Sequence, residues 1–154
     1  MSTKNVVPRT ILLALLLAVV SCSGQKDRKK LEGQELINSF EGEHKHLAAD
    51  IAFLGDAYCF YFGEKQKSPA DWKELEPHAR ETDRPDDLKR HVRDDISFVW
   101  NVDLTSREGS KNYVLVYERN ADKDGNRLVV TGDSKLRLMG EEEFQTALKA
   151  TKKK

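Results

Sequence analysis

Few side chains of this 154-residue chain have the types and spacing that chemistry requires. Cys59 lies in the apolar stretch AYCFYFG, where no neighbouring histidine or basic residue lowers the pKa of its thiol. This setting favours a buried, unreactive thiol over a catalytic nucleophile. The chain also lacks a Ser-His-Asp order, a glycine-rich phosphate loop and an HExxH motif. We therefore predict no catalytic residue.

Two sequence patterns superficially suggest metal binding. His44 and His46 are two positions apart, so they point to different sides of a helix and cannot share a metal ion. The stretch NADKDGN imitates the start of an EF-hand calcium loop, but Thr131 occupies the twelfth position, where that loop needs a glutamate. We expect a polar hairpin there, and we predict neither a metal site nor a cofactor.

Cys22 closes an apolar run near the N-terminus. Lys4 and Arg9 precede the apolar residues 11–20, ILLALLLAVV, and the small Ser21 follows them. A membrane-spanning helix needs about 20 apolar residues. The run is too short for a permanent span and is typical of a signal peptide.

The order Val19, Val20, Ser21, Cys22 resembles the lipobox of bacterial lipoproteins. The resemblance implies cleavage between Ser21 and Cys22, and lipid attachment to the thiol of Cys22, which makes the membrane a partner. The alternative is an ordinary secretory signal that leaves Cys22 as a plain thiol. Because Ser23 is not the aspartate that favours inner-membrane retention, we expect a lipid-anchored, periplasm-facing envelope protein, with the outer membrane favoured over the inner.

The predicted organisation has four segments. Residues 1–21 form the signal peptide, 22–34 a flexible tether, 35–150 a single α+β domain, and 151–154 a disordered basic tail. Removing the signal peptide leaves 24 basic and 26 acidic residues, a net charge of −2 with neutral histidines. This balance argues against a nucleic-acid partner. With Cys22 lipidated, Cys59 has no partner for a disulfide bond.

Two helices are predicted in the first half of the domain. Apolar residues recur every three or four positions over residues 36–62, which predicts one long amphipathic helix that ends at Gly63. The stretch SPADWKELEP, residues 68–77, predicts a short helix that Ser68 caps and Pro77 ends.

The second half predicts strands. Residues 96–104 alternate apolar and polar side chains, and the strands YVLVYER, RLVVT and KLRLM follow, with Asp124 and Gly125 as the strongest hairpin signal. The stretch EEEFQTALKA predicts a closing helix. The expected fold class is α+β, with a long N-terminal amphipathic helix packed on a three- to four-stranded antiparallel sheet and a short C-terminal helix. The predicted core contains Phe40, Leu47, Ile51, Tyr58, Trp72, Phe98, Trp100 and Leu115.

Several stretches together resemble pseudopilin-derived proteins of unknown function. They are FLGDAYCFYF, KSPADWKEL, FVWNVDL and the ending YVLVYERN…GNRLVVTGDSKLRLMGEEEF, spread over roughly residues 47–148. The prepilin peptidase site of that family is missing. The resemblance implies a pilin-like head that has exchanged its membrane-spanning helix for a lipid anchor.

Two functions are consistent with these features. The preferred one is a non-enzymatic envelope lipoprotein that binds or scaffolds an envelope protein of unknown identity. The alternative is a small envelope hydrolase or metal-dependent enzyme that uses the scattered residues His78, His91 and Asp94.

Overall fold

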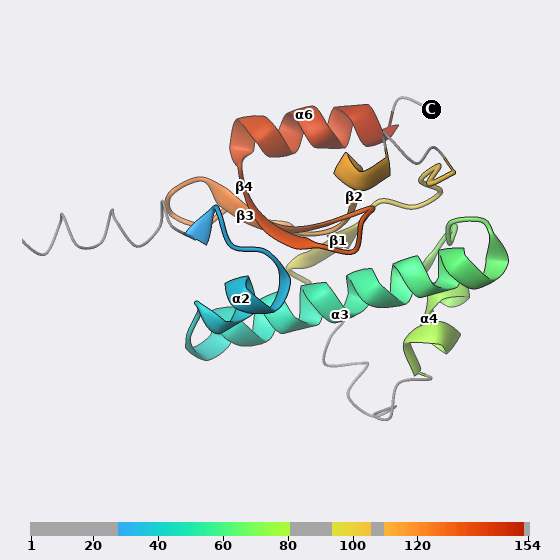
Figure 1. Ribbon diagram of the computed structural model, residues 1–154, viewed down its shortest axis with the longest axis horizontal. Helices are drawn as coiled ribbons and strands as arrows, with labels where there is room; N and C mark the ends of the chain where they lie inside the picture. Colours follow the sequence, from blue (N-terminus) through green and yellow to red (C-terminus); the bar gives the residue numbers. More distant parts are fainter. Residues whose placement is uncertain (1–27, 81–93, 106–109, 153–154) are drawn as a thin grey trace, which may run out of the picture.

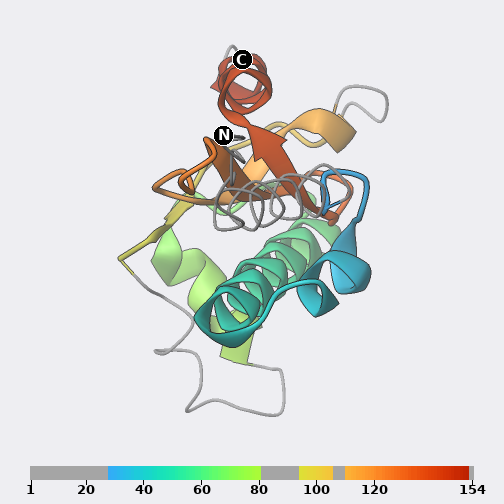
Figure 2. The same ribbon diagram turned by 90° about the vertical axis from the view of Figure 1, so that its left-hand side faces the viewer.

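The computed structural model describes residues 28–80, 94–105 and 110–152. Within these ranges the chain forms helices and a four-stranded antiparallel sheet, which confirms the α+β class. Figures 1 and 2 show α3 on one side of the sheet and α6 on the other. In chain order the elements are α2 (Gly33–Asn38), α3 (Gly42–Lys65), α4 (Trp72–Arg80), β1 (Ile96–Phe98), the 3-10 turn η1 (Ser110–Asn112), β2 (Val114–Glu118), β3 (Asn126–Thr131), β4 (Leu136–Gly140) and α6 (Glu141–Lys152).

The strands follow one another in the order β1-β2-β3-β4, and every neighbouring pair is antiparallel. This confirms the predicted meander. The β2–β3 and β3–β4 turns are too short for the crossover that parallel strands require. Gly125 adopts a φ of 77° in the β2–β3 turn, and Ser134 adopts a φ of 61° in the β3–β4 turn.

The core lies between α3 and the sheet, where β3 is almost entirely buried. Helix α3 lies close to β3 at Gly55, where an added Cβ would lie only 2.3 Å from Cγ1 of Val130. A glycine is therefore required at this contact. Five of the predicted core residues are buried, and Trp72, Phe98 and Trp100 pack against the core while partly exposed.

The helix predicted as one element over residues 36–62 is divided into α2 and α3. The hydroxyl of Ser39 donates a 2.7 Å hydrogen bond to the carbonyl of Leu36, and the chain resumes a helix at Gly42 with a φ of 56°. Serine side chains compete in this way with backbone hydrogen bonding, and glycine readily adopts the left-handed conformation. The prediction of one continuous helix was wrong.

The short helix is displaced from its predicted position. It begins at Trp72, because Oδ1 of Asp71 accepts the backbone N–H of Glu74 at 3.1 Å and caps the helix. The hydroxyl of Ser68 instead donates to the carbonyl of Val102. Pro77 lies inside the helix and does not end it.

The strand predicted over residues 96–104 stops at Phe98. Asn101 has a φ of 58°, which no extended strand contains, and the side chain of Val99 is buried although it broke the predicted alternation. The rings of Phe98 and Trp100 stack at a centroid distance of 4.6 Å, partly exposed. The left-handed backbone at Asn101 therefore interrupts the extended conformation predicted up to residue 104.

The predicted tether is wrong for residues 28–34, which belong to the folded part of the chain. The guanidinium of Arg28 donates a 2.8 Å hydrogen bond to the carbonyl of Ser39, and it lies 4.8 Å from the ring centroid of Phe40. The cation–π contact and the hydrogen bond to the carbonyl hold residues 28–34 against the domain, although their many charges predicted a solvated segment.

The predicted disordered tail is wrong for residues 151–152, which complete α6. Oγ1 of Thr151 accepts a 2.9 Å hydrogen bond from the backbone N–H of Val114 and donates to the carbonyl of Ala147 at 2.8 Å. Because Thr151 is buried and bonded to the start of β2, the last turn of the helix is held against the sheet.

Candidate functional site

The predicted lipid-attachment and cleavage residues, Cys22 and Ser21, lie outside the described residues. The described chain begins at Arg28, six positions after Cys22. The contacts of residues 28–34 therefore fix where the described part of the chain begins.

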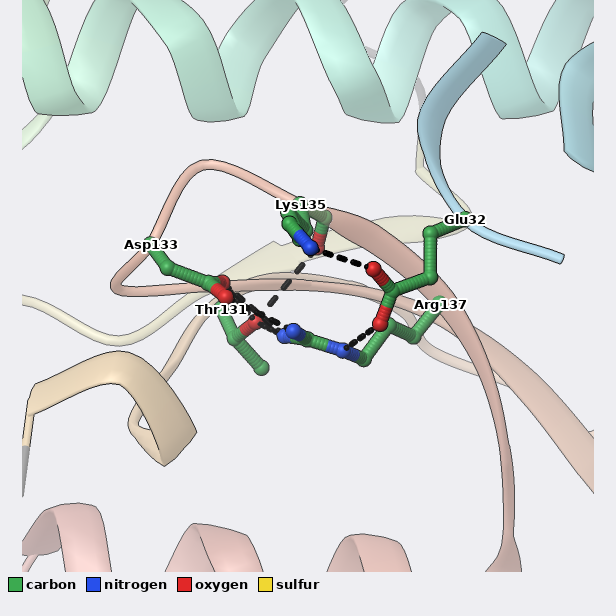
Figure 3. A network of polar contacts seen from close by, with 5 residues as sticks. All are labelled: Glu32, Thr131, Asp133, Lys135 and Arg137. Carbon is green, nitrogen blue, oxygen red and sulfur yellow. Dashed lines mark hydrogen bonds and ion pairs between the residues drawn. The ribbon is translucent and has the colours of Figure 1, made fainter. Parts of the chain in front are cut away.

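Glu32, in the segment 28–34, joins an ion-pair network at the β3–β4 turn (Figure 3). The carboxylate of Glu32 accepts hydrogen bonds from Lys135 Nζ at 2.6 Å and Arg137 Nε at 2.9 Å. Arg137 also donates to Asp133, at 2.7 Å to Oδ2, and to the hydroxyl of Thr131. This network ties the N-terminal segment to β4.

The network's charges satisfy one another. The hydrogen bonds from Lys135, and then from Arg137, lower the pKa of Glu32. Burial alone would raise the pKa of Asp133, but the hydrogen bonds from Arg137 and Thr131 outweigh it and lower that pKa. Both carboxylates therefore stay ionised and bonded at neutral pH, an arrangement that suits a structural brace rather than an acid or base catalyst.

Cys59 lies near this network, on α3, and its side chain is partly buried. Burial raises the pKa of its thiol to about 11. The neighbouring hydroxyl of Ser134 donates to the carboxylate of Asp56. Because the thiolate is the nucleophilic form, this raised pKa leaves little of the nucleophilic form of Cys59 at neutral pH.

Of the residues proposed for an enzyme, the structure describes His78 and Asp94. His78, on α4, packs edge-on against Tyr61 with ring centroids 4.9 Å apart. Its Nδ1 lies 3.1 Å from Oε2 of Glu64, in an orientation that does not make a hydrogen bond. Asp94 is exposed just before β1, and His91 lies outside the described residues.

A cleft of about 330 Å³ opens between two loops at the C-terminal end of α3. One wall is the α3–α4 loop, residues 66–70, and the other is the loop after β1, residues 101–105. Phe62 adds an apolar side chain from α3. We call this hollow the interloop cleft.

Hydrogen bonds brace the two walls of the interloop cleft against each other. The hydroxyl of Ser68 donates to the carbonyl of Val102, and the backbone N–H of Asn101 donates to the carbonyl of Pro69 at 3.0 Å. These cross-links join segments that are more than thirty positions apart in the chain. These hydrogen bonds fix the two walls relative to each other.

Glu74 holds the first wall in place. Its carboxylate accepts hydrogen bonds from the Tyr61 hydroxyl at 2.9 Å, from the backbone N–H of Ala70 at 3.0 Å, and from Lys67 at 3.1 Å. The hydrogen bonds from Ala70, Tyr61 and Lys67 lower the pKa of Glu74, in that order of importance. The loop is thus tied to α3 and α4 by one ionised side chain.

A second, larger hollow of about 840 Å³ runs beside α6. Lys29, Tyr113 and Met139 line it, together with the acidic first turn of α6, Glu141–Glu143. Acidic residues at a helix N-terminus stabilise the helix through its dipole. This stabilisation of α6 explains why the three glutamates lie beside the hollow, and the explanation requires no ligand.

Sequence reasoning did not identify the interloop cleft. Asn101 offered one signal, because asparagine is enriched in left-handed backbone conformations. Gln66, with a φ of 55°, offered none, since glycine is the usual residue at this position after a helix.

No group of three or more histidine, cysteine, aspartate or glutamate side chains in the described ranges could hold a metal ion. Among the helices of those ranges, none has the length and apolar character of a membrane span. Comparison with protein-family models, curated proteins and solved structures found no match to the chain.

Proposed function

We propose that the chain is a lipid-anchored lipoprotein of the bacterial cell envelope, and that its folded domain acts by binding rather than by catalysis. The observation that carries the proposal is the placement of Cys22. It directly follows a small residue at the end of a basic and then apolar segment that is too short to cross a bilayer. Periplasm-facing attachment, with the outer membrane favoured, is part of the proposal.

The chemistry of the described residues supports a binding role. The thiol of Cys59 is protonated at neutral pH, and the carboxylates of Glu32 and Asp133 are engaged by Arg137. His78 packs between aromatic rings and Glu64 rather than facing a nucleophile. These groups have structural roles, so a partner, which we propose to be another envelope protein or an envelope component, would be recognised through the surface.

The contacts of Arg28 and Glu32 make residues 28–34 part of the folded domain, so only a short length of chain separates the domain from Cys22. At about 3.4 Å per extended residue, the six positions from Cys22 to Arg28 span at most about 20 Å. A lipidated Cys22 would therefore hold the domain against or close to the bilayer surface rather than far into the periplasm.

The pilin-like head stays part of the proposal through the sequence resemblance to pseudopilin-derived proteins alone. Helix α3 packs along an antiparallel sheet, with contacts to β2, β3 and β4. The break between α2 and α3 means that the head would begin with two helices, of which α2 contacts β4.

The proposal is tested by metabolic labelling with a clickable fatty acid, followed by membrane fractionation. Wild type should take up the label and sediment with membranes, and Cys22→Ser should lose both properties. Two or three acyl chains, at about 0.8 kcal/mol per buried CH₂, give stable anchoring.

Cys59→Ser is the matched control, because it removes the other thiol and should leave labelling and fractionation unchanged. An unlabelled wild type that fractionates as a soluble protein would refute the anchor and favour an ordinary cleaved signal.

A further inference from the structure

The interloop cleft has an apolar floor and a polar rim. Val102 and Leu104 are buried, and they line the cleft together with the partly exposed ring of Phe62. The exposed side chains of Gln66 and Asn101 lie at its edge. A ligand that fits must therefore present both an apolar face and several hydrogen-bonding groups.

The charged side chains that line the cleft are already paired with other groups, so a neutral ligand fits the cleft better than an ion does. The ammonium group of Lys67 is held by Glu74 at 3.1 Å. The carboxylate of Asp103 accepts hydrogen bonds from the backbone N–H and the hydroxyl of Thr105. An anion would find no unpaired cation among the described lining residues, and a divalent cation would find one carboxylate only.

Two amides remain for a ligand. The side chain of Asn101 is exposed and makes no hydrogen bond to another described residue. Nε2 of Gln66 donates to the carbonyl of Gly63 at 2.7 Å, which leaves its amide oxygen as an acceptor. An amide offers both donors and acceptors, and this matches hydroxyl groups, which also do both.

Both amide-bearing residues hold left-handed backbone conformations, with φ values of 55° for Gln66 and 58° for Asn101. Such conformations cost energy for residues other than glycine, and they persist where the surrounding structure imposes them. Here Gln66 caps α3 and Asn101 bonds to Pro69, so the two amides are displayed from fixed positions. A ligand would not have to order either loop, which favours binding.

We propose that the interloop cleft binds a neutral carbohydrate, with the apolar face of one sugar ring packed against the partly exposed ring of Phe62. The hydroxyl or acetamido groups of the sugar would bond to the side-chain amides of Asn101 and Gln66. This inference deepens the proposed function, because it names a class of ligand for the binding domain. It rests on the proposed function only in assuming that the domain acts by binding. A volume of about 330 Å³ lies at the lower end of the range for small-molecule sites, so a single ring is the expected occupant.

The test is an NMR titration of the full ¹⁵N-labelled chain in detergent micelles, with N-acetylglucosamine as the probe. We expect saturable shift changes confined to the two walls, residues 66–70 and 101–105. Asn101→Gly removes the amide while allowing the positive φ, and it should weaken binding about tenfold, the loss expected for one or two hydrogen bonds.

Ser134→Gly is the matched control, because it makes the same kind of substitution at a residue with a φ of 61° outside the cleft. It should leave the affinity unchanged. Inorganic phosphate, titrated in parallel, should cause no saturable change at the walls.

Three outcomes would overturn the proposal: no saturable shift with the sugar, saturable shifts outside the two walls, or tighter binding of phosphate than of the sugar. An equal loss in Asn101→Gly and Ser134→Gly would also overturn the assigned role of Asn101. These outcomes are distinguishable from failure of the proposed anchor. Fatty-acid labelling depends on Cys22 and not on the cleft.

Discussion

Replacing Gly55 with alanine tests the closest approach between α3 and the sheet. The new Cβ would lie 2.3 Å, 2.8 Å and 2.9 Å from the three side-chain carbons of Val130, all closer than real Cβ contacts. Val130 is fully buried on β3, so it cannot turn its branched side chain toward solvent. Either α3 or β3 must move.

The size of the effect follows from two opposing terms. Overpacking of a core typically costs about 1–3 kcal/mol. Alanine is better than glycine in a helix by about 1 kcal/mol. Because the contact is so short, we expect the free energy of unfolding to fall by about 2 kcal/mol.

Urea unfolding followed by circular dichroism measures this change. Gly63→Ala is the matched control, since Gly63 is in the same helix and an added Cβ there would meet nothing within 4 Å. It should stabilise the chain by up to about 1 kcal/mol through helix propensity. In a Val130→Ala background, which removes two of the three clashing carbons, the loss caused by Gly55→Ala should shrink by about 1 kcal/mol. A Gly55→Ala variant as stable as wild type, or one whose loss does not depend on Val130, would refute the packing argument.

Two further predictions concern titrating side chains. Because the pKa of Cys59 is about 11 rather than its usual value near 9, the thiolate fraction at pH 8 falls about 100-fold. Iodoacetamide should therefore modify Cys59 about 100 times more slowly in the native Cys22→Ser chain than in urea, and equal rates would contradict its burial. Burial also raises the pKa of Glu118, so the stability linked to this group is complete below its unfolded pKa and is lost as the pH rises through its folded pKa. The variant Glu118→Gln should consequently have a higher free energy of unfolding than wild type at pH 7, and this difference should disappear in acid. A wild type that is more stable than the variant at pH 7 would contradict the raised pKa of Glu118.

Local sequence patterns determined the elements whose contacting residues are close together in the sequence. The hairpin at Asp124 and Gly125 and the antiparallel pairing across the GDS turn follow from residues within a few positions of one another. The closing helix EEEFQTALKA is predicted by its acidic first turn and apolar spacing, and it is present as α6. Turn chemistry and periodicity act over such distances, and that is why they can be read without a structure.

The apolar run 11–20 and Cys22, from which a signal peptide and an anchor are predicted, are also features of the sequence alone, because a targeting segment is predicted from its local composition. The candidate anchor therefore comes entirely from the sequence. It remains a prediction, since Cys22 lies outside the described residues.

Only the tertiary structure decided which distant segments meet. Glu32 bonds to Lys135 and Arg137 across more than 100 positions, and this contact turned a charged stretch that reads as a tether into part of the fold. The interloop cleft likewise depends on the bond between Asn101 and Pro69. Neither partner's local sequence specifies the other. Such contacts form when the burial of the α3–sheet core brings the segments together, and hydrogen bonds then select the backbone conformations that local propensity disfavours.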